Sequence, residues 1–357
     1  MTDSADPDFE QIMATSTAPY PVQFHLAGFA KEEDAQKLAN LTATFVQYIG
    51  TKLNLQGLDG ITIAFDYNKA LVDLDRGYET SFVLTPSSEF VQGVAMSPAV
   101  IREGTIKTHI VFAAGVFAGF VDTDNELWRG LYYQLAHECG HVHDRRAFDI
   151  AFPNFLLTRY EFEDHLDAWY FQMGDGSRCE YTASRLSAEF DPDQIALHEE
   201  SFMLVFEGLG ARIEALEEAF VEDGDGTKLF TELSKEYERI LRHASYVLGH
   251  VDGLQGDMTP APKFKAFIES DHWLAEYITK LHDTLKEIWA KYGEWTSLSD
   301  LEQPGVIVQL LLARNGVKLH LIAGSAGGYW FGVAFLVDRR RLCRLWPEAK
   351  TSNPDSI

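Results

Sequence analysis

Cysteine is scarce in this chain, with three residues in 357. A small, odd number in a chain of this length does not supply the disulfide framework of many secreted domains. We therefore expect a reducing compartment and a cytoplasmic location. The chain is 46% hydrophobic, which is enough to bury a core in one large domain or in two closely packed ones.

Long apolar runs and basic charge are also lacking. No stretch of about 18 uninterrupted apolar residues predicts a membrane span. The polar segment 1–17 has neither the basic start nor the apolar run of a signal peptide, and we expect residues 1–20 to be flexible. Only 30 basic residues face 54 acidic ones, for a net charge of −24. Nucleic acid and anionic membranes would be repelled, so we expect neither as a partner.

One short segment carries recognisable chemistry, namely His137-Glu138-Cys139-Gly140-His141. Two histidines four residues apart on a helix present both imidazoles on one face, about one turn from each other. Such a pair can hold zinc, and Glu138 can then take a proton from a water that the metal activates. The pattern predicts metal-assisted hydrolysis, although a structural histidine pair would produce the same five letters.

The surrounding sequence places this motif on a helix. Thr123-Asp124-Asn125-Glu126 has the form of a capping box. Apolar residues then recur at steps of three and four, at Trp128, Leu131, Leu135, Cys139 and Val142. A helix is predicted from near Asn125 to about Arg146. Its apolar stripe leaves His137 and His141 to one side, so we expect them to border a cavity instead of filling the core.

A catalytic zinc site needs a third protein ligand and keeps its fourth position open for water. Residues 179–188 predict the start of a second helix with Glu180 in its first turns. Small residues at 183, 184, 187 and 188 would let this helix approach the first one closely. Asp167, Glu163 and Asp175 remain alternative third ligands.

His-Glu-x-x-His followed by Glu-x-x-Ala on a later helix resembles the zincin superfamily of zinc metallopeptidases, in its gluzincin branch. The resemblance covers about residues 125–190. It implies that His137, His141 and Glu180 are zinc ligands and that Glu138 is the general base. Many gluzincins place an acidic or amide residue after the alanine, where it orients the first histidine. This chain has Ser184 there, which leaves that orienting role open.

Several other residues are candidates for supporting roles. Tyr181, His198 or His165 could stabilise the oxyanion, as tyrosine, histidine or arginine commonly does. Asp144 and Asp149 could orient a zinc ligand, or they could simply be solvated in a charged helix end. His143 points away from the pair and is expected to be a surface residue.

The remaining patterns indicate an α+β fold. Alternation predicts strands over 60–66, 91–98 and 107–113, with a turn at 102–104, and these form a small sheet that leads into the zinc helix. Helical periodicity covers 193–222, 228–250 and 271–292. Residues 306–313 and 317–323 suggest a hairpin on Asn315-Gly316, followed by an apolar segment over 329–337, with a helix over 305–314 as the alternative. We expect a catalytic region over 21–190, a helical region over 191–300 and a hairpin-like segment over 301–357.

The sequence thus predicts an intracellular zinc metallopeptidase that cleaves a protein or peptide, with an edge strand pairing an extended substrate. One alternative is a binding or regulatory protein with a structural or inactive zinc site. Structural sites are normally closed by four protein ligands, and no convincing fourth ligand is present. A zinc hydrolase of a non-peptide amide is the other alternative. The patterns leave the oligomeric state open.

Overall fold

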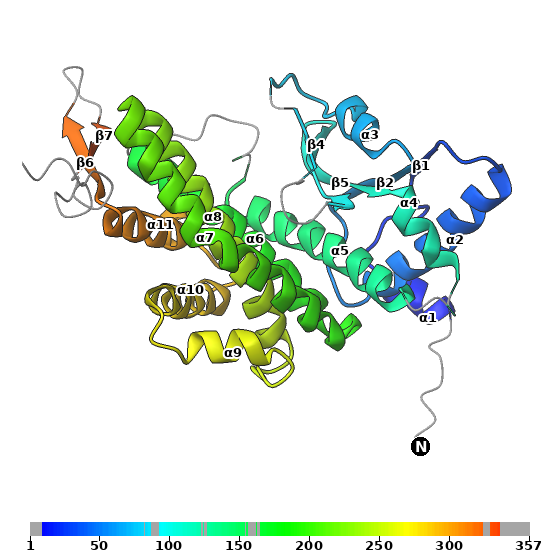
Figure 1. The fold of residues 1–357 in the computed structure, drawn as a ribbon. Coiled ribbons are helices and arrows are strands. Elements are labelled where there is room, and N and C mark those ends of the chain that lie inside the picture. The colour runs from blue at the N-terminus through cyan, green and yellow to red at the C-terminus, as the bar shows by residue number, and fades with distance from the viewer. Residues whose placement is uncertain are drawn as a thin grey trace, which may run out of the picture.

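The computed structural model describes residues 9–323 and 329–335, except 82, 87–92, 123, 125–126, 154, 156–161 and 163–164. The fold is α+β: a small mixed sheet lies in the N-terminal part, and helices make up most of the rest (Figure 1). Helices α5 (Trp128–Ala151) and α6 (His165–Ser187) lie between the sheet and the helical body. None of the described helices combines the length and the apolar composition needed to cross a bilayer.

The sheet has three parallel strands, β1 (Phe24–Ala27), β2 (Leu58–Ala64) and β5 (Thr105–Ala113). Two short strands, β3 (Ala95–Met96) and β4 (Ala99–Arg102), pair antiparallel with β5. The predicted strands over 60–66 and 107–113 are present as β2 and β5. The strand predicted over 91–98 is limited to β3 among its described residues, and β1 was not anticipated.

The predicted turn at 102–104 is confirmed as the link between β4 and β5. Glu103 and Gly104 both have positive φ, at 53° and 76°, which is the geometry of a tight hairpin turn. Helices α2 (Glu32–Ile49), α3 (Tyr67–Asp73) and α4 (Ala114–Phe117) lie beside the sheet (Figure 1). The sheet and α2 share one hydrophobic core with α5. The apolar stripe predicted for the helix that carries His137 and His141 packs into this core, with Leu131, Leu135, Cys139 and Val142 all buried.

Residues 9–20 lie in the segment for which the sequence predicts flexibility. Phe9–Thr15 form helix α1, and the Thr17 hydroxyl donates hydrogen bonds to the carbonyl oxygens of Gly50 and Leu53.

The helical body contains α7 (Ile195–Asp223), α8 (Gly226–Gly253), α9 (Pro262–Ile268) and α10 (Trp273–Ala290). The three helices predicted over 193–222, 228–250 and 271–292 correspond to α7, α8 and α10. Their apolar faces share one core with α6. Short 3₁₀ turns complete the connections, at Ala118–Val121, Ala188–Phe190, Pro192–Gln194 and Leu298–Asp300.

The hairpin predicted on Asn315-Gly316 is wrong. Gln303–Arg314 form helix α11, and β6 (Val317–Ala323) pairs antiparallel with β7 (Tyr329–Phe335) instead. Pro304 in the first helical turn favours the helix. The apolar run then gains burial in the core of the helical body, through Ile307, Val308, Leu311 and Leu312. Residues 336 and 337 of the predicted apolar segment lie outside the described residues.

The second helix of the site also differs from its prediction. Instead of starting near residue 179, α6 begins at His165. Glu180 therefore lies about four turns into a long helix, not in its first turns. The small residues after it do bring two helices together: a Cβ built on Gly140 of α5 would lie 3.0 Å from the Cα of Ala183.

Candidate metal centre

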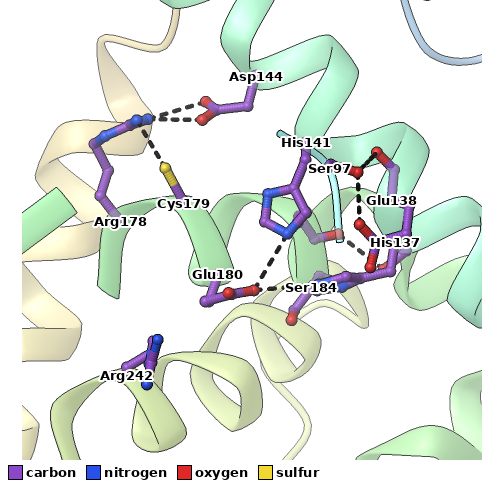
Figure 2. Close-up of polar contacts among 12 residues, drawn as sticks. Ser97, His137, Glu138, His141, Asp144, Arg178, Cys179, Glu180, Ser184 and Arg242 are labelled. Carbon is purple, nitrogen blue, oxygen red and sulfur yellow. Dashed lines mark hydrogen bonds and ion pairs between the residues drawn. The ribbon is translucent and has the colours of Figure 1, made fainter. Parts of the chain in front are cut away.

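Three predicted ligands meet where α5 and α6 pack against each other. The Nε2 atoms of His137 and His141 lie 3.2 Å and 3.3 Å from the same oxygen, Glu180 Oε2. Figure 2 shows both imidazoles and the carboxylate pointing toward one another. We call His137, His141 and Glu180 the triad. One ligand atom from each residue lies within 4.8 Å of the others, so the group can hold a metal ion.

The charges of the triad suit a cation. Burial alone would raise the pKa of Glu180, but the charge of His141 and hydrogen bonds from both histidines hold it well below its usual range. Burial would lower the pKa of His141, yet the Glu180 carboxylate outweighs it and the net shift is upward. Glu180 is therefore ionised. Two imidazole nitrogens and one carboxylate oxygen form a donor set that zinc accepts.

Burial of the triad is greater than the sequence suggested. The His137 side chain is 5% exposed, whereas that of His141 is 16% exposed. Both histidines were expected to border a cavity, and His141 does line a pocket, whereas His137 is not among the residues that line that pocket. His137 is covered because α6 packs on α5 and the ring of Tyr246 from α8 stacks on its imidazole at 5.7 Å.

Glu138 lies on α5 beside the triad and is itself almost completely buried. Its carboxylate accepts a hydrogen bond from the Ser97 hydroxyl at 2.6 Å and another from Gln134 Nε2 at 2.9 Å. Ser97 comes from the segment between β3 and β4, so the sheet helps to orient this carboxylate. Two fixed donors, one on each oxygen, hold the side chain in one position next to the histidines (Figure 2).

Two residues of helix α8 also lie beside the triad, which the sequence did not predict. Burial first, and then the charge of Glu180, raise the pKa of Tyr246 well above its usual range, so its phenol is neutral. Arg242, one turn earlier, pairs with Glu238 at 3.5 Å and lies near Glu180 (Figure 2). A tyrosine and an arginine four apart on a predicted helix were visible in the sequence, but nothing local linked them to residues 137–180.

Of the oxyanion candidates, only His198 lies near the triad. Its ring lies 5.3 Å from that of Tyr246, and its Nε2 shares a 2.8 Å hydrogen bond with the Tyr133 hydroxyl. Burial and the neighbouring His250 and His137 hold the pKa of His198 well below its usual range. His198 is therefore neutral and already hydrogen-bonded, and the ring of Tyr246 contacts both it and His137.

Tyr181 and His165 are not brought to the triad, contrary to the role expected for them. Tyr181 follows Glu180 directly, so it points about 100° away around the helix. Its hydroxyl donates to Asp252 and accepts from Arg185. His165 is exposed at the start of α6, fifteen residues before Glu180, which corresponds to about 22 Å along a helix.

Asp144 is not solvated, because it forms a buried ion pair across the two helices. Both of its carboxylate oxygens accept from Arg178 Nη1, at 3.0 Å and 2.9 Å, and both side chains are under 5% exposed. It makes no described hydrogen bond to His137 or His141, so the ligand-orienting role proposed for it is not seen. Asp149, two turns beyond His141, is only partly exposed.

Neither Ser184 nor His143 makes a described hydrogen bond to the triad. No described hydrogen bond joins Ser184 to either histidine, and His137 Nδ1 is buried without a partner among the described residues. His143 accepts the Asn54 backbone N–H at its Nδ1, at 2.7 Å, and stacks on Tyr292. It does not belong to the triad, and it is partly buried instead of being the surface residue that the sequence predicted.

Two of the three alternative third ligands, Asp167 and Asp175, do not reach the histidines either. Asp167 lies thirteen residues before Glu180 on α6, which is about 20 Å along the helix. Asp175 accepts hydrogen bonds from Arg178 instead. Glu163 lies outside the described residues.

Compared with protein-family models, with curated proteins and with solved structures, the chain has no significant match.

Proposed function

We propose that this protein is a zinc-dependent metallopeptidase that hydrolyses a peptide bond of a protein or peptide. The observation that carries the proposal is the convergence of the triad with a second carboxylate, that of Glu138, which is oriented separately beside it. Three ligands and a neighbouring carboxylate that is not itself a ligand match a catalytic zinc site, whereas a structural site would use four ligands.

The residues of the chain have distinct roles in this reaction. A zinc ion held by the triad would lower the pKa of a bound water to near neutrality and polarise the substrate carbonyl. Glu138 accepts the proton of the attacking water and passes it to the leaving nitrogen, as a general base and then a general acid. The hydrogen bonds from Ser97 and Gln134 keep its carboxylate in place for this transfer.

Tyr246 is the best-placed oxyanion donor. It is neutral, it lies close enough to Glu180 and Glu138 for their charges to raise its pKa further, and its ring is fixed between His137 and His198. A phenolic O–H aimed at developing negative charge is a typical stabilising group in acyl transfer.

The sheet offers a place for an extended substrate. Strand β3 ends the hydrogen-bonded strand order and contacts α5, and Ser97, which directly follows it, contacts Glu138. Main-chain pairing at such an edge gives affinity without requiring one sequence. The outer edge of β4 is less open to a substrate, since its Ile101 N–H already donates a hydrogen bond to the Arg76 carbonyl oxygen.

Zinc content is the first test. The purified protein should hold close to one zinc per chain by metal analysis after mild dialysis, and His137→Ala or His141→Ala should lose it. His143→Ala is a matched control, because it removes a histidine from the same helix without touching the triad. If the two triad variants retain zinc as the wild type does, the proposal is wrong.

Hydrolysis is the second test. Glu138→Gln should keep zinc and fold but lose about 10²- to 10⁴-fold in rate, because the amide cannot accept a proton. Fragments of peptide libraries, read by mass spectrometry, give the rate. A variant as fast as the wild type would exclude Glu138 as the base. A zinc-loaded wild type that cuts no peptide would favour the binding-protein alternative or a non-peptide amide substrate.

A further inference from the structure

A pocket opens directly beside His141, and Tyr246 is not among the residues that line it. It has a volume of about 320 Å³ and runs along one face of α5, past His141, Asp144, Arg145 and Phe148. Residues 98–101 around β4 form one wall, and α6 forms another through Phe171, Asp175 and Arg178. A substrate side chain next to the cleaved bond would enter this space.

The lining of this pocket carries more positive than negative charge. Three arginines face it, Arg76, Arg145 and Arg178, against two carboxylates, Asp144 and Asp175. Both carboxylates are already bound to Arg178, which receives Asp144 at 2.9 Å and Asp175 at 2.8 Å. Arg178 offsets only one of these two negative charges, and with Arg76 and Arg145 the three arginines leave the lining one net positive charge against the two carboxylates.

Neither Arg76 nor Arg145 has a carboxylate of the described residues within ion-pair distance. Arg145 Nη1 donates to the Ser97 carbonyl oxygen at 2.8 Å, and Arg76 Nε donates to the Ala99 carbonyl oxygen at 2.7 Å. Burial lowers the pKa of Arg145, and the nearby charges of Asp175 and Asp144 offset only part of this shift. The positive charge of Arg76 lowers the pKa further, which places the two guanidinium groups near each other. Two guanidinium groups held close together at a pocket, each bound only to neutral oxygens, are arranged to receive an anion.

We propose that this pocket binds a carboxylate of the substrate, which rests on the proposed function and specifies its substrate class. Guanidinium groups bind carboxylates through short, charge-assisted hydrogen bonds. The rings of Phe148, Phe155 and Phe171 line the same pocket and can cover the methylene groups that carry the carboxylate. In a chain of net charge −24, a local positive site is needed for an acidic group to enter. The carboxylate belongs either to an acidic side chain or to a free C-terminus.

Peptide pools distinguish these two sources. Octapeptides with capped ends, randomised except for one fixed Glu, are compared with pools carrying Gln at that position. A second pair of pools has a free or an amidated C-terminus and neither Asp nor Glu. Cleavage by the zinc-loaded protein should favour Glu over Gln, or free over amidated ends, by about tenfold or more, the usual gain from charge-assisted hydrogen bonds.

Arginine variants test where the preference comes from. The measured quantity is the ratio of cleavage between the carboxylate pool and its neutral partner. Arg76→Gln and Arg145→Gln should each lower this ratio by about tenfold, whereas Arg145→Lys should keep most of it because the charge remains. The ratio is read instead of the absolute rate, since Arg145 also holds Ser97, which contacts Glu138. Arg129→Gln is the matched control: it makes the same charge change on an exposed residue of α5 and should leave the ratio unchanged.

Binding separates this proposal from the proposed function. Zinc-loaded Glu138→Gln protein is incubated with the same pools, and the retained peptides are counted by mass spectrometry. Retention that favours carboxylates and depends on Arg76 and Arg145 supports the proposal even if the wild type cuts nothing. Equal retention and equal cleavage of both members of each pair overturn it, as does a preference that survives in both glutamine variants.

Discussion

Replacing Gly140 with alanine should separate the stability of the fold from the geometry of the metal centre. Gly140 lies between the two histidines on α5, and a Cβ there would lie 3.0 Å from the Cα, 3.2 Å from the carbonyl oxygen and 3.3 Å from the Cβ of Ala183. Two of these atoms belong to the backbone of α6 and cannot rotate away. Glu180 lies three residues before Ala183, so a displacement of α6 moves the third ligand.

The expected magnitudes follow from two opposing effects. Alanine in place of glycine inside a helix stabilises it by about 0.5–1 kcal/mol, whereas overpacking a close contact costs about 1–3 kcal/mol. The free energy of unfolding should therefore change little or fall by about 2 kcal/mol. Ligand distances in metal sites tolerate only about 0.2 Å. Since α6 must move by a few tenths of an ångström, zinc affinity should fall about 10- to 100-fold, as when ligand orientation is disturbed.

Gly210→Ala is the matched control. Gly210 is an exposed residue within α7, and no heavy atom lies within 4 Å of a Cβ built there. The free energy of unfolding of the Gly210→Ala protein should rise by about 0.5–1 kcal/mol, and the variant should bind zinc as the wild type does. Urea unfolding of the chelator-treated proteins and competition with a chromogenic chelator give the two quantities. If Gly140→Ala gains as much stability as Gly210→Ala and keeps wild-type affinity, the close approach of α5 and α6 does not position Glu180.

Three further predictions concern other contacts. Asp144→Ala should cost about 3–5 kcal/mol in urea unfolding, because it removes the buried one of the two carboxylates that pair with the buried Arg178; a loss under 1 kcal/mol would contradict this. Tyr246→Phe should keep zinc but lower the peptide hydrolysis rate about 10²- to 10³-fold, and an unchanged rate would remove it from the mechanism. Asp252→Asn should destabilise the fold by about 1–3 kcal/mol at neutral pH. Burial raises the pKa of Asp252, but hydrogen bonds from His282 and Tyr181 outweigh it and the net shift is downward. Its stabilisation is therefore present above its unfolded pKa, near 4, and is lost as pH falls through the lower folded value. The free energies of unfolding of the wild type and of Asp252→Asn, measured from pH 7 to pH 3, should converge in acid. A difference that stays constant with pH would refute this.

Local periodicity determined much of the fold in advance. Helix α5, the three long helices after residue 190 and the strands β2 and β5 follow from apolar spacing. Each of these helices buries one apolar stripe. The position of His137 and His141 on one face also follows from helix geometry alone. The segment over 303–314 was ambiguous for the same reason, since a short apolar run satisfies either a buried helix or a strand.

Only the tertiary structure decided what surrounds those histidines. The burial of His137, the ion pair of Asp144 with Arg178 and the approach of Tyr246 all depend on α6 and α8 packing against α5. These partners lie 34 to 109 residues away in sequence from the residues they meet, and no local pattern encodes which faces of two helices will touch. The sequence specifies which side chains each helix offers, whereas packing determines which of them share one site.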